Sequence, residues 1–396
     1  MKAFCSLPFT HIYNDSYGVM MPCCYAAVDH PYHKPYEDAT FPAPMIKDGF
    51  YEFIKSGAMR QLRLDMMQDQ PTDLVKDVCR KCIALEEKGI PSPRQPVSGN
   101  LFGRNLSLKL RLFGNTCNLK CFMCNIKNSS NRIRQTEKMM EFNPEVGQML
   151  HYSDLSEELK SKDGFDLSVV DPETFNKCIE DIKKIADKID SVTIIGGEPF
   201  ILVSHYKLLD ALIECGEAKN ITLRYDSNLT KLHWSGCHIK DYIKHFKDCR
   251  VSFSLDGYGK YNDYIRFPSK WEEVTANYQE IKEYSKVNIS VTLTALSVLH
   301  LDELQQWIGD LPVQWNNVHT PEIAMIENLH PSIRKRLVNK YQDTGLSFLC
   351  DELSKDVLDW EHKWEKFTSY LEAIDHVNGT DYKSVFPELC DLSEDR

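Results

Sequence analysis

Three cysteines fall within eight residues, directly after a predicted apolar strand. Cys117, Cys121 and Cys124 have the spacing C-x3-C-x2-C in the stretch LRLFGNTCNLKCFMCNI, which covers residues 110–126. Three thiolates hold three corners of an iron–sulfur cubane and leave the fourth iron open, whereas structural zinc is closed by four protein ligands. A loop at the carboxyl end of a strand is also where catalytic groups gather in parallel α/β folds. The triplet therefore indicates a 4Fe-4S cluster with an open position, and zinc is the alternative.

Strands and helices alternate along the part of the chain that contains this triplet. Such alternation predicts an α/β fold with a mainly parallel sheet and helices outside it. We expect a partial (β/α)6 TIM-like barrel, with a doubly wound sheet as the alternative. The predicted strands are 106–112, 191–195, 220–225, 250–254, 287–294 and 313–319, and the predicted helices lie near 172–189, 204–215, 238–247, 271–285 and 301–309.

The remaining segments predict the domain organisation. A proline- and glycine-rich stretch is typical of a linker, and the C-terminal part has helical periodicity. The predicted order is a small Cys-rich domain over 1–88, a linker over 89–103, the barrel over 104–330 with an insertion at 125–170, and a helical extension over 331–396.

Net charge and cysteine usage narrow the class of protein. The chain of 396 residues has a net charge of -11, which argues against bulk attraction to nucleic acid or anionic membranes. No run of 18 apolar residues and no signal peptide is visible, so we expect a cytoplasmic protein without a membrane partner. Bunched cysteines in such a protein indicate metal binding, while scattered ones are usually small buried hydrophobes. The scattered ones are Cys178, Cys215, Cys237, Cys249, Cys350 and Cys390.

Three further motifs follow the next three predicted strands. They are IIGGEPF around Gly196, YDSNLT around Asn228, and SFSLDGYGKYNDYIR, which runs from Ser252 to Arg266. Together with the triplet they resemble the radical S-adenosylmethionine superfamily: its GGEP motif, its Thr-Asn-Gly segment in part, and its Ser-x-Asp-Gly segment with a following arginine. The resemblance covers about residues 106–320.

The resemblance implies an enzyme with a particular cofactor chemistry. The open iron would chelate S-adenosylmethionine, and one electron would split the sulfonium to give a 5′-deoxyadenosyl radical that abstracts a substrate hydrogen. An electron donor such as flavodoxin or ferredoxin is an implied partner. Glycines allow close backbone approach to the methionine, and an arginine fork suits its carboxylate. The implied cofactor contacts are Met123 (in place of the usual aromatic residue), Gly196, Gly197, Glu198, Ser227, Asn228, Ser254, Asp256 and Arg266.

The N-terminal cysteines resemble a known accessory domain of this superfamily. A cysteine, a short hairpin ending in Gly-x3-Pro-Cys and a later C-x2-C are typical of the twitch domain, the shortened form of SPASM. The resemblance implies an auxiliary iron–sulfur cluster, with zinc as the alternative, because four thiolates suit either metal. Here the domain precedes the barrel, whereas it usually follows it. The implied ligands are Cys5, Cys23, Cys79 and Cys82, with Cys24 as a spare for Cys23.

Three hypotheses about function follow. The leading one is a radical enzyme acting on a peptide or protein side chain, and the second is the same chemistry on a nucleotide, sugar or other small metabolite. The third is a non-catalytic metal-binding scaffold, against which the intact triplet and GGEP motif count. The insertion carries Arg132, Arg134 and Lys138, which we expect on a solvated helix face, with contact to an anionic substrate as the alternative.

Overall fold

The computed structural model describes most of the chain. Most of the predicted linker and part of the predicted insertion lie outside the described residues. The residues described are 3–15, 17–30, 38–94, 104–111, 114–155, 160 and 165–392.

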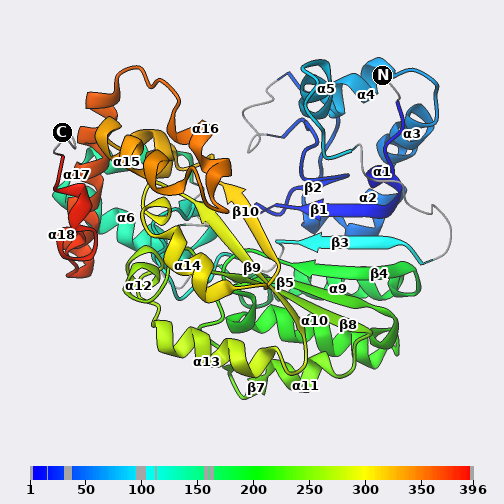
Figure 1. Ribbon diagram of the computed structural model, residues 1–396. Helices are drawn as coiled ribbons and strands as arrows, with labels where there is room; N and C mark the ends of the chain where they lie inside the picture. Colours follow the sequence, from blue (N-terminus) through cyan, green and yellow to red (C-terminus); the bar gives the residue numbers. More distant parts are fainter. Residues whose placement is uncertain are drawn as a thin grey trace. The chain divides into compact units, whose positions relative to one another are not determined.

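Eight strands form one sheet, and six of them follow one another in chain order across it (Figure 1). The sheet order is β10-β9-β8-β5-β4-β3-β1-β2. A doubly wound sheet would reverse this order at a switch point, and no reversal occurs between β3 and β10. The predicted α/β class with a mainly parallel sheet is confirmed, and the strand order is that of the expected partial barrel. The six strands are β3 (Leu106–Leu110), β4 (Ile189–Ile194), β5 (Thr222–Ser227), β8 (Asp248–Ser254), β9 (Lys286–Leu293) and β10 (Val313–Asn317).

The N-terminal hairpin extends this sheet. Its strands are β1 (His11–Asn14) and β2 (Met20–Met21), which pair antiparallel. Strand β1 also pairs in parallel with β3, with His11 opposite Ser107. Ile12, Met20 and Met21 are buried, so the hairpin is held by apolar contacts as well as by backbone pairing.

The chain divides into two compact units, each made of several segments. Unit 1 comprises Met1–Gly114, Asp166–Tyr225 and Ser235–Arg250, and unit 2 comprises Asn115–Phe165, Asp226–Trp234 and Val251–Arg396. The helices of unit 1 are α1 (Leu7–Thr10), α2 (Phe50–Lys55), α3 (Gly57–Met66), α4 (Asp73–Val78), α5 (Arg80–Glu87), α8 (Leu167–Val170), α9 (Pro172–Lys183), α10 (Val203–Glu214) and α11 (Ile239–Ile243). Those of unit 2 are α6 (Ser130–Phe142), α7 (Glu145–Met149), α12 (Lys260–Ile265), α13 (Trp271–Ile281), α14 (Leu301–Ile308), α15 (Pro331–Tyr341), α16 (Cys350–Leu353), α17 (Trp360–Asn378) and α18 (Tyr382–Val385).

Helix α9 illustrates why the predicted helices form. Asp171 caps it by accepting a hydrogen bond from the Thr174 amide, and Pro172 occupies the first helical position. Phe175, Cys178, Ile179 and Ile182 recur at helical spacing and are all buried, so one apolar face packs against the core. The expectation that the scattered cysteines are buried holds for Cys178 and Cys249; it is wrong for the others, of which Cys215 and Cys390 are exposed and Cys237 and Cys350 half-buried.

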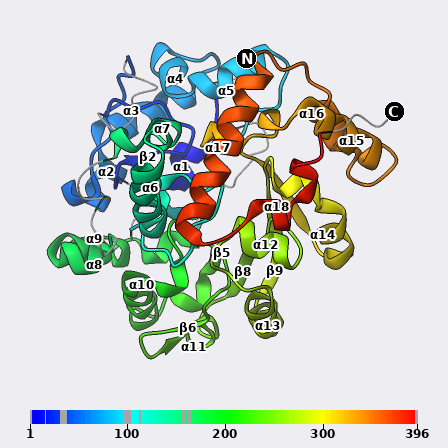
Figure 2. The same cartoon turned by 90° about the vertical axis from the view of Figure 1, so that its left-hand side faces the viewer.

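The helical C-terminal region packs on the segment that follows the triplet. Helices α6 and α17 lie side by side in Figure 2. The ring of Phe122 lies 6.1 Å from that of Phe367 and 5.7 Å from that of Tyr370, both on α17. This packing puts α17 in contact with Phe122, which lies between Cys121 and Cys124 in the chain.

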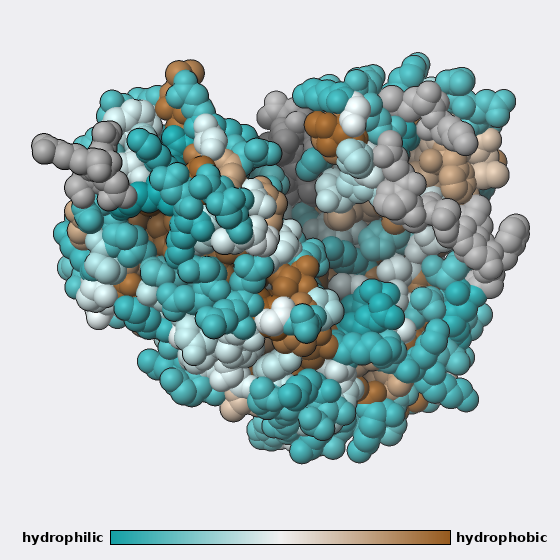
Figure 3. Space-filling view, viewed as in Figure 1, coloured by the Kyte–Doolittle hydropathy of each residue, from teal (hydrophilic) through white to brown (hydrophobic). Residues whose placement is uncertain are grey.

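Hydrophilic residues cover most of the C-terminal helical region in Figure 3. Single apolar side chains, such as Leu358, are also exposed in this region. Scattered exposed apolar residues of this kind are normal on protein surfaces. None of the helices in the described part of the chain combines the length and apolar character that a membrane crossing requires.

Candidate functional site

The cysteine loop, residues 117–124, is tied by backbone hydrogen bonds to the segment that ends α12. The Lys120 amide donates to the Phe267 carbonyl and the Phe122 amide donates to the Ile265 carbonyl, both at 2.7 Å. Alternate amides of the loop are thus fixed to alternate carbonyls at the end of α12 and in the turn that follows it. A loop with two such bonds has little freedom, so its thiols are held in place before any ligand binds.

Arg266 lies between the two carbonyls that hold the loop, and its side chain reaches the loop's central cysteine. Its Nη1 is 4.0 Å from the Cys121 Sγ. Its Nε forms an ion pair of 2.6 Å with Oδ2 of Asp256, which is fully buried. The other oxygen of Asp256 accepts a hydrogen bond of 2.6 Å from the Thr292 amide. The predicted residues Cys121, Asp256 and Arg266 therefore meet in one buried charged cluster.

Burial sets the ionisation of this cluster. It raises the pKa of the Cys121 thiol to about 12, although the Arg266 guanidinium acts in the opposite direction. Burial also raises the pKa of Asp256 above its ordinary value, again against Arg266. The protein alone thus disfavours the thiolate, so a bound metal would have to supply the compensating positive charge.

Asn118, inside the loop, connects the triplet to the motif after β5. Its Nδ2 donates to Thr230 Oγ1 at 2.7 Å, and its Oδ1 accepts from Asn228 Nδ2 at 3.2 Å. Ser227 Oγ accepts from the amide of Leu229, which adopts a left-handed φ of 51°. Backbone strain of this kind is often stored at functional sites. The predicted residue Asn228 is thus connected to the cysteine loop through two side chains, Asn118 and Thr230, that the sequence did not single out. Ser227 contributes a hydrogen bond within its own turn.

Four other predicted residues make less specific contributions. Cys117 and Cys124 are half-buried, while Met123 is buried. Ser254, the last residue of β8, is half-buried.

The GGEP turn follows β4 in unit 1. Gly196 and Gly197 have φ values of 92° and 54°, in the region that favours glycine. A Cβ on Gly196 would meet Arg111 Cγ at 3.5 Å, an ordinary contact, so backbone conformation rather than space requires glycine there. Glu198 is buried, and its carboxylate accepts a hydrogen bond of 3.3 Å from the Phe200 amide. The turn is therefore fixed by its own acidic side chain.

The four predicted N-terminal ligands surround one small cavity in unit 1. A backbone hydrogen bond of 2.9 Å from Ala27 to the Val78 carbonyl brings the segment after β2 beside the end of α4. Cys24 is exposed, so Cys23 is the member of the pair that faces inward. The cavity is lined by Cys5, Cys23, Cys79 and Cys82, together with apolar residues and Arg94.

Arg94 gives this cavity a positive wall. Its Nε and Nη2 each lie 2.6 Å from an oxygen of Glu86, while its Nη1 is buried and has no hydrogen-bond partner among the described residues. Burial raises the pKa of Cys79 to about 12, with Arg94 acting in the opposite direction. Across the described residues no three His, Cys, Asp or Glu side chains converge closely enough to hold a single metal ion. The four thiols therefore line one cavity without coming close enough together to bind one ion.

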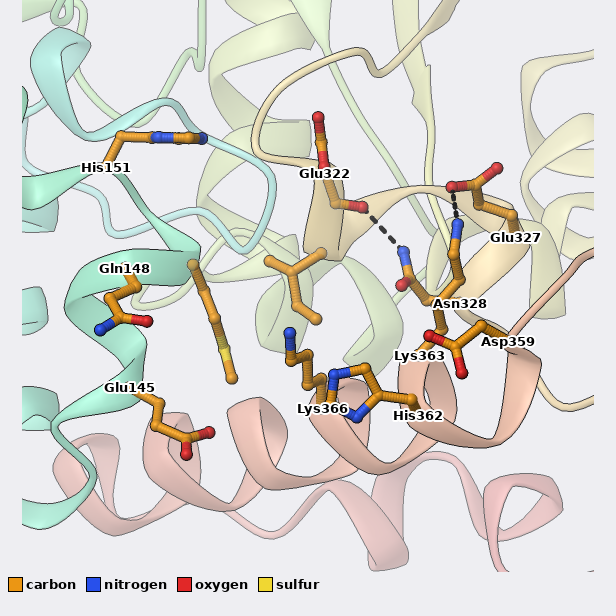
Figure 4. Close-up of a pocket in the computed structure, with 12 residues that line it drawn as sticks. Glu145, Gln148, His151, Glu322, Glu327, Asn328, Asp359, His362, Lys363 and Lys366 are labelled. Carbon is orange, nitrogen blue, oxygen red and sulfur yellow. Dashed lines mark hydrogen bonds and ion pairs between the residues drawn. The ribbon is translucent and has the colours of Figure 1, made fainter.

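A polar cavity of about 570 Å³ lies in unit 2 (Figure 4). Side chains of α7, of the 3-10 turns η9 (Glu322–Ala324) and η10 (Ile326–Asn328), and of α17 face it. Asn125, next to Cys124, donates a hydrogen bond of 3.3 Å to Thr320, two residues before Glu322. The segment that leads into η9 is therefore hydrogen-bonded to the residue that follows the triplet.

The sequence and fold were compared with known proteins. The family model described as the Radical SAM superfamily matches residues 112–311. Among solved structures, native anSMEcpe with bound AdoMet is similar over 60% of this chain and 60% of its own, with 17% identity and a TM-score of 0.40. The structure of Streptococcus suis SuiB bound to S-adenosylmethionine is similar over 80% of this chain and 66% of its own, with 13% identity and a TM-score of 0.30. No curated protein sequence matches the chain.

The GGEP turn generates the first prediction. Gly197→Val places a β-branched side chain at a left-handed φ, which should cost about 1–2 kcal/mol of stability and should weaken S-adenosylmethionine binding by about tenfold or more. The control is Gly216→Val, because Gly216 has a φ of 77° and open space around it. That variant should show the stability loss alone. Calorimetric titration and thermal melting check this, and equal binding by both variants would make the turn merely structural.

The buried ion pair generates the second prediction. Asp256→Asn leaves the Arg266 guanidinium buried without a carboxylate and should lower the free energy of unfolding by about 3–5 kcal/mol in urea denaturation. The double variant Asp256→Asn/Arg266→Met should recover part of that loss. Glu273→Gln breaks the exposed Lys231–Glu273 pair and should cost less than about 1 kcal/mol. Similar losses in Asp256→Asn and Glu273→Gln would contradict the argument.

Proposed function

This chain belongs to the radical SAM superfamily, and on that premise we propose that it is an enzyme that modifies a peptide or protein side chain. The observation that carries the proposal is the pinned cysteine loop, whose central thiol, Cys121, lies 4.0 Å from Arg266 of the buried Asp256–Arg266 pair. When bound, the cluster supplies one electron to S-adenosylmethionine, whose cleavage yields the 5′-deoxyadenosyl radical that abstracts a substrate hydrogen.

The residues present fit a three-ligand cluster and its cofactor. Cys117, Cys121 and Cys124 would hold three irons, and the loop itself supplies no fourth thiol. Asp256 holds the Arg266 guanidinium by Nε and leaves its Nη groups to bind and orient the methionine carboxylate. The other cofactor contacts that we propose from the motifs are Met123, Gly196, Gly197, Glu198, Ser227, Asn228 and Ser254.

The cavity of Figure 4 favours a peptide over a nucleotide substrate. Its wall carries four carboxylates, those of Glu145, Glu322, Glu327 and Asp359, against two lysines, and one lysine is already paired with Glu327. Phosphate groups would be repelled there, whereas a polypeptide offers backbone groups and basic side chains to it. Whether peptides or nucleotides accelerate 5′-deoxyadenosine formation decides between the two substrate classes.

The N-terminal cavity supports an auxiliary iron–sulfur cluster on Cys5, Cys23, Cys79 and Cys82, in a twitch-like domain. The four thiols line one cavity but are too far apart to bind a single ion. An iron–sulfur cluster is wider than one ion, so it fits them better than zinc does. The unpaired Arg94 Nη1 could donate to an anionic cluster. We also propose flavodoxin or ferredoxin as the electron donor and the cytoplasm as the location, where free thiols persist.

Removing the triplet tests the central activity. Protein reconstituted without oxygen and then reduced should convert S-adenosylmethionine to 5′-deoxyadenosine, and the Cys117/Cys121/Cys124→Ala variant should not. The loop is held by backbone bonds rather than by thiols, so the variant should still fold. The control removes three other thiols, Cys215, Cys350 and Cys390, and should keep full activity. Cleavage at the normal rate by the triplet variant would refute the assignment.

The same triplet variant tests the auxiliary site through metal analysis. If the N-terminal thiols hold a cluster, the variant retains iron, sulfide and a visible charge-transfer band. If they hold zinc, it is colourless and contains about one zinc per chain. Zinc without iron would overturn the auxiliary cluster and leave the catalytic assignment intact.

A further inference from the structure

Arg132, in the first turn of α6, is completely buried. Its Nη1 donates to Gln135 Oε1, and its Nη2 donates to the Tyr370 hydroxyl and, at 3.1 Å, to the Phe122 carbonyl. Its Nε has no hydrogen-bond partner within the described residues. The expectation that Arg132 lies on a solvated helix face is wrong, whereas Arg134 is half-buried and Lys138 exposed.

All of these partners are neutral, which is unusual for a buried guanidinium. The two other buried arginines discussed above have carboxylates: Asp256 for Arg266 and Glu86 for Arg94. Among the described residues, no carboxylate forms an ion pair with Arg132. An unpaired buried ion costs several kcal/mol, so a counter-charge is expected nearby.

The cysteine loop is the place where such a counter-charge can arise. Phe122, whose carbonyl accepts from Arg132, lies between Cys121 and Cys124. Burial lowers the pKa of Arg132 to about 10, and negative charge on Cys121 and Cys124 acts in the opposite direction. Cysteines ligate iron as thiolates, so a cluster on the loop would bring negative charge to this position.

We propose that Arg132 is a positioning residue that supplies the buried counter-charge of the cluster and raises its reduction potential. The proposal rests on the proposed function, because it requires a cluster on the triplet. Reduction adds an electron to the cluster, and a fixed cation in a water-poor site stabilises the more negative state. The hydrogen bond to the Phe122 carbonyl also holds the loop against α6.

The test replaces Arg132 by methionine, which removes the charge at similar length. The Phe122 carbonyl keeps a partner, because the Tyr370 hydroxyl lies 3.4 Å from it. Arg134→Met is the matched control, since it removes the same charge from the same helix at a position that water screens.

The first readout is a redox titration of the reconstituted cluster followed by electron paramagnetic resonance. Arg132→Met should lower the equilibrium constant for reduction by about tenfold or more, which is about 59 mV for a one-electron couple. Arg134→Met should leave it unchanged. Equal potentials in the two variants at equal iron content would overturn the proposal.

The second readout compares thermal stability with and without the cluster. The metal-free Arg132→Met protein should melt no lower than the wild type, because it loses an uncompensated charge, while cluster binding should raise its melting temperature less than that of the wild type. Equal increases in both proteins would overturn the proposal.

An Arg132→Lys variant decides the outcome if the methionine variant holds no iron. Iron retained by the lysine variant supports a role for charge, and iron lost equally from both means that the guanidinium hydrogen bonds, not the charge, are needed. A wild type that holds no cluster at all would instead refute the proposed function.

Discussion

Two backbone hydrogen bonds, between the cysteine loop and residues 265–267, determine how the site in unit 2 is built. They place Arg266 beside Cys121, and Arg266 in turn fixes the buried Asp256. The geometry of the thiols is therefore set by main-chain pairing, which does not depend on the identity of the intervening side chains. Such preorganisation lowers the entropy that a cluster would otherwise have to remove on binding.

Charge is the second constraint at this site. Two arginines that are largely removed from water contact the cysteine loop: Arg132 at Phe122 and Arg266 at Cys121. Within the described residues, Arg266 has a carboxylate partner and Arg132 has none. Such an arrangement is costly in the metal-free protein and favourable once the loop is anionic. The fold thus holds an uncompensated positive charge in a buried position, and an anionic cluster on the loop would compensate it.

Periodicity was sufficient to predict the six strands of a mainly parallel sheet and the main helices, because β3 to β10 alternate with amphipathic helices such as α9. The spacing of the sequence motifs was sufficient to predict candidate site residues, and three of them, Cys121, Asp256 and Arg266, lie in contact in the structure. The burial of Arg132 could not be predicted from the sequence. An arginine near Arg134 on a polar helix is expected to face water, and the covering residue, Tyr370 of α17, is far away in the chain. Asn118 and Thr230 were missed for a similar reason: their partners lie about 110 residues away in the chain.

The packing of α17 behind Phe122 has a consequence for biosynthesis. The Tyr370 hydroxyl that approaches the Phe122 carbonyl comes from a residue 248 positions further along the chain. At about 5–20 residues per second, the ribosome needs roughly 10–50 s to translate that interval. A nascent chain therefore carries the cysteine loop without its α17 packing for that long, and only the earlier pairing with residues 265–267 can hold the loop in the meantime.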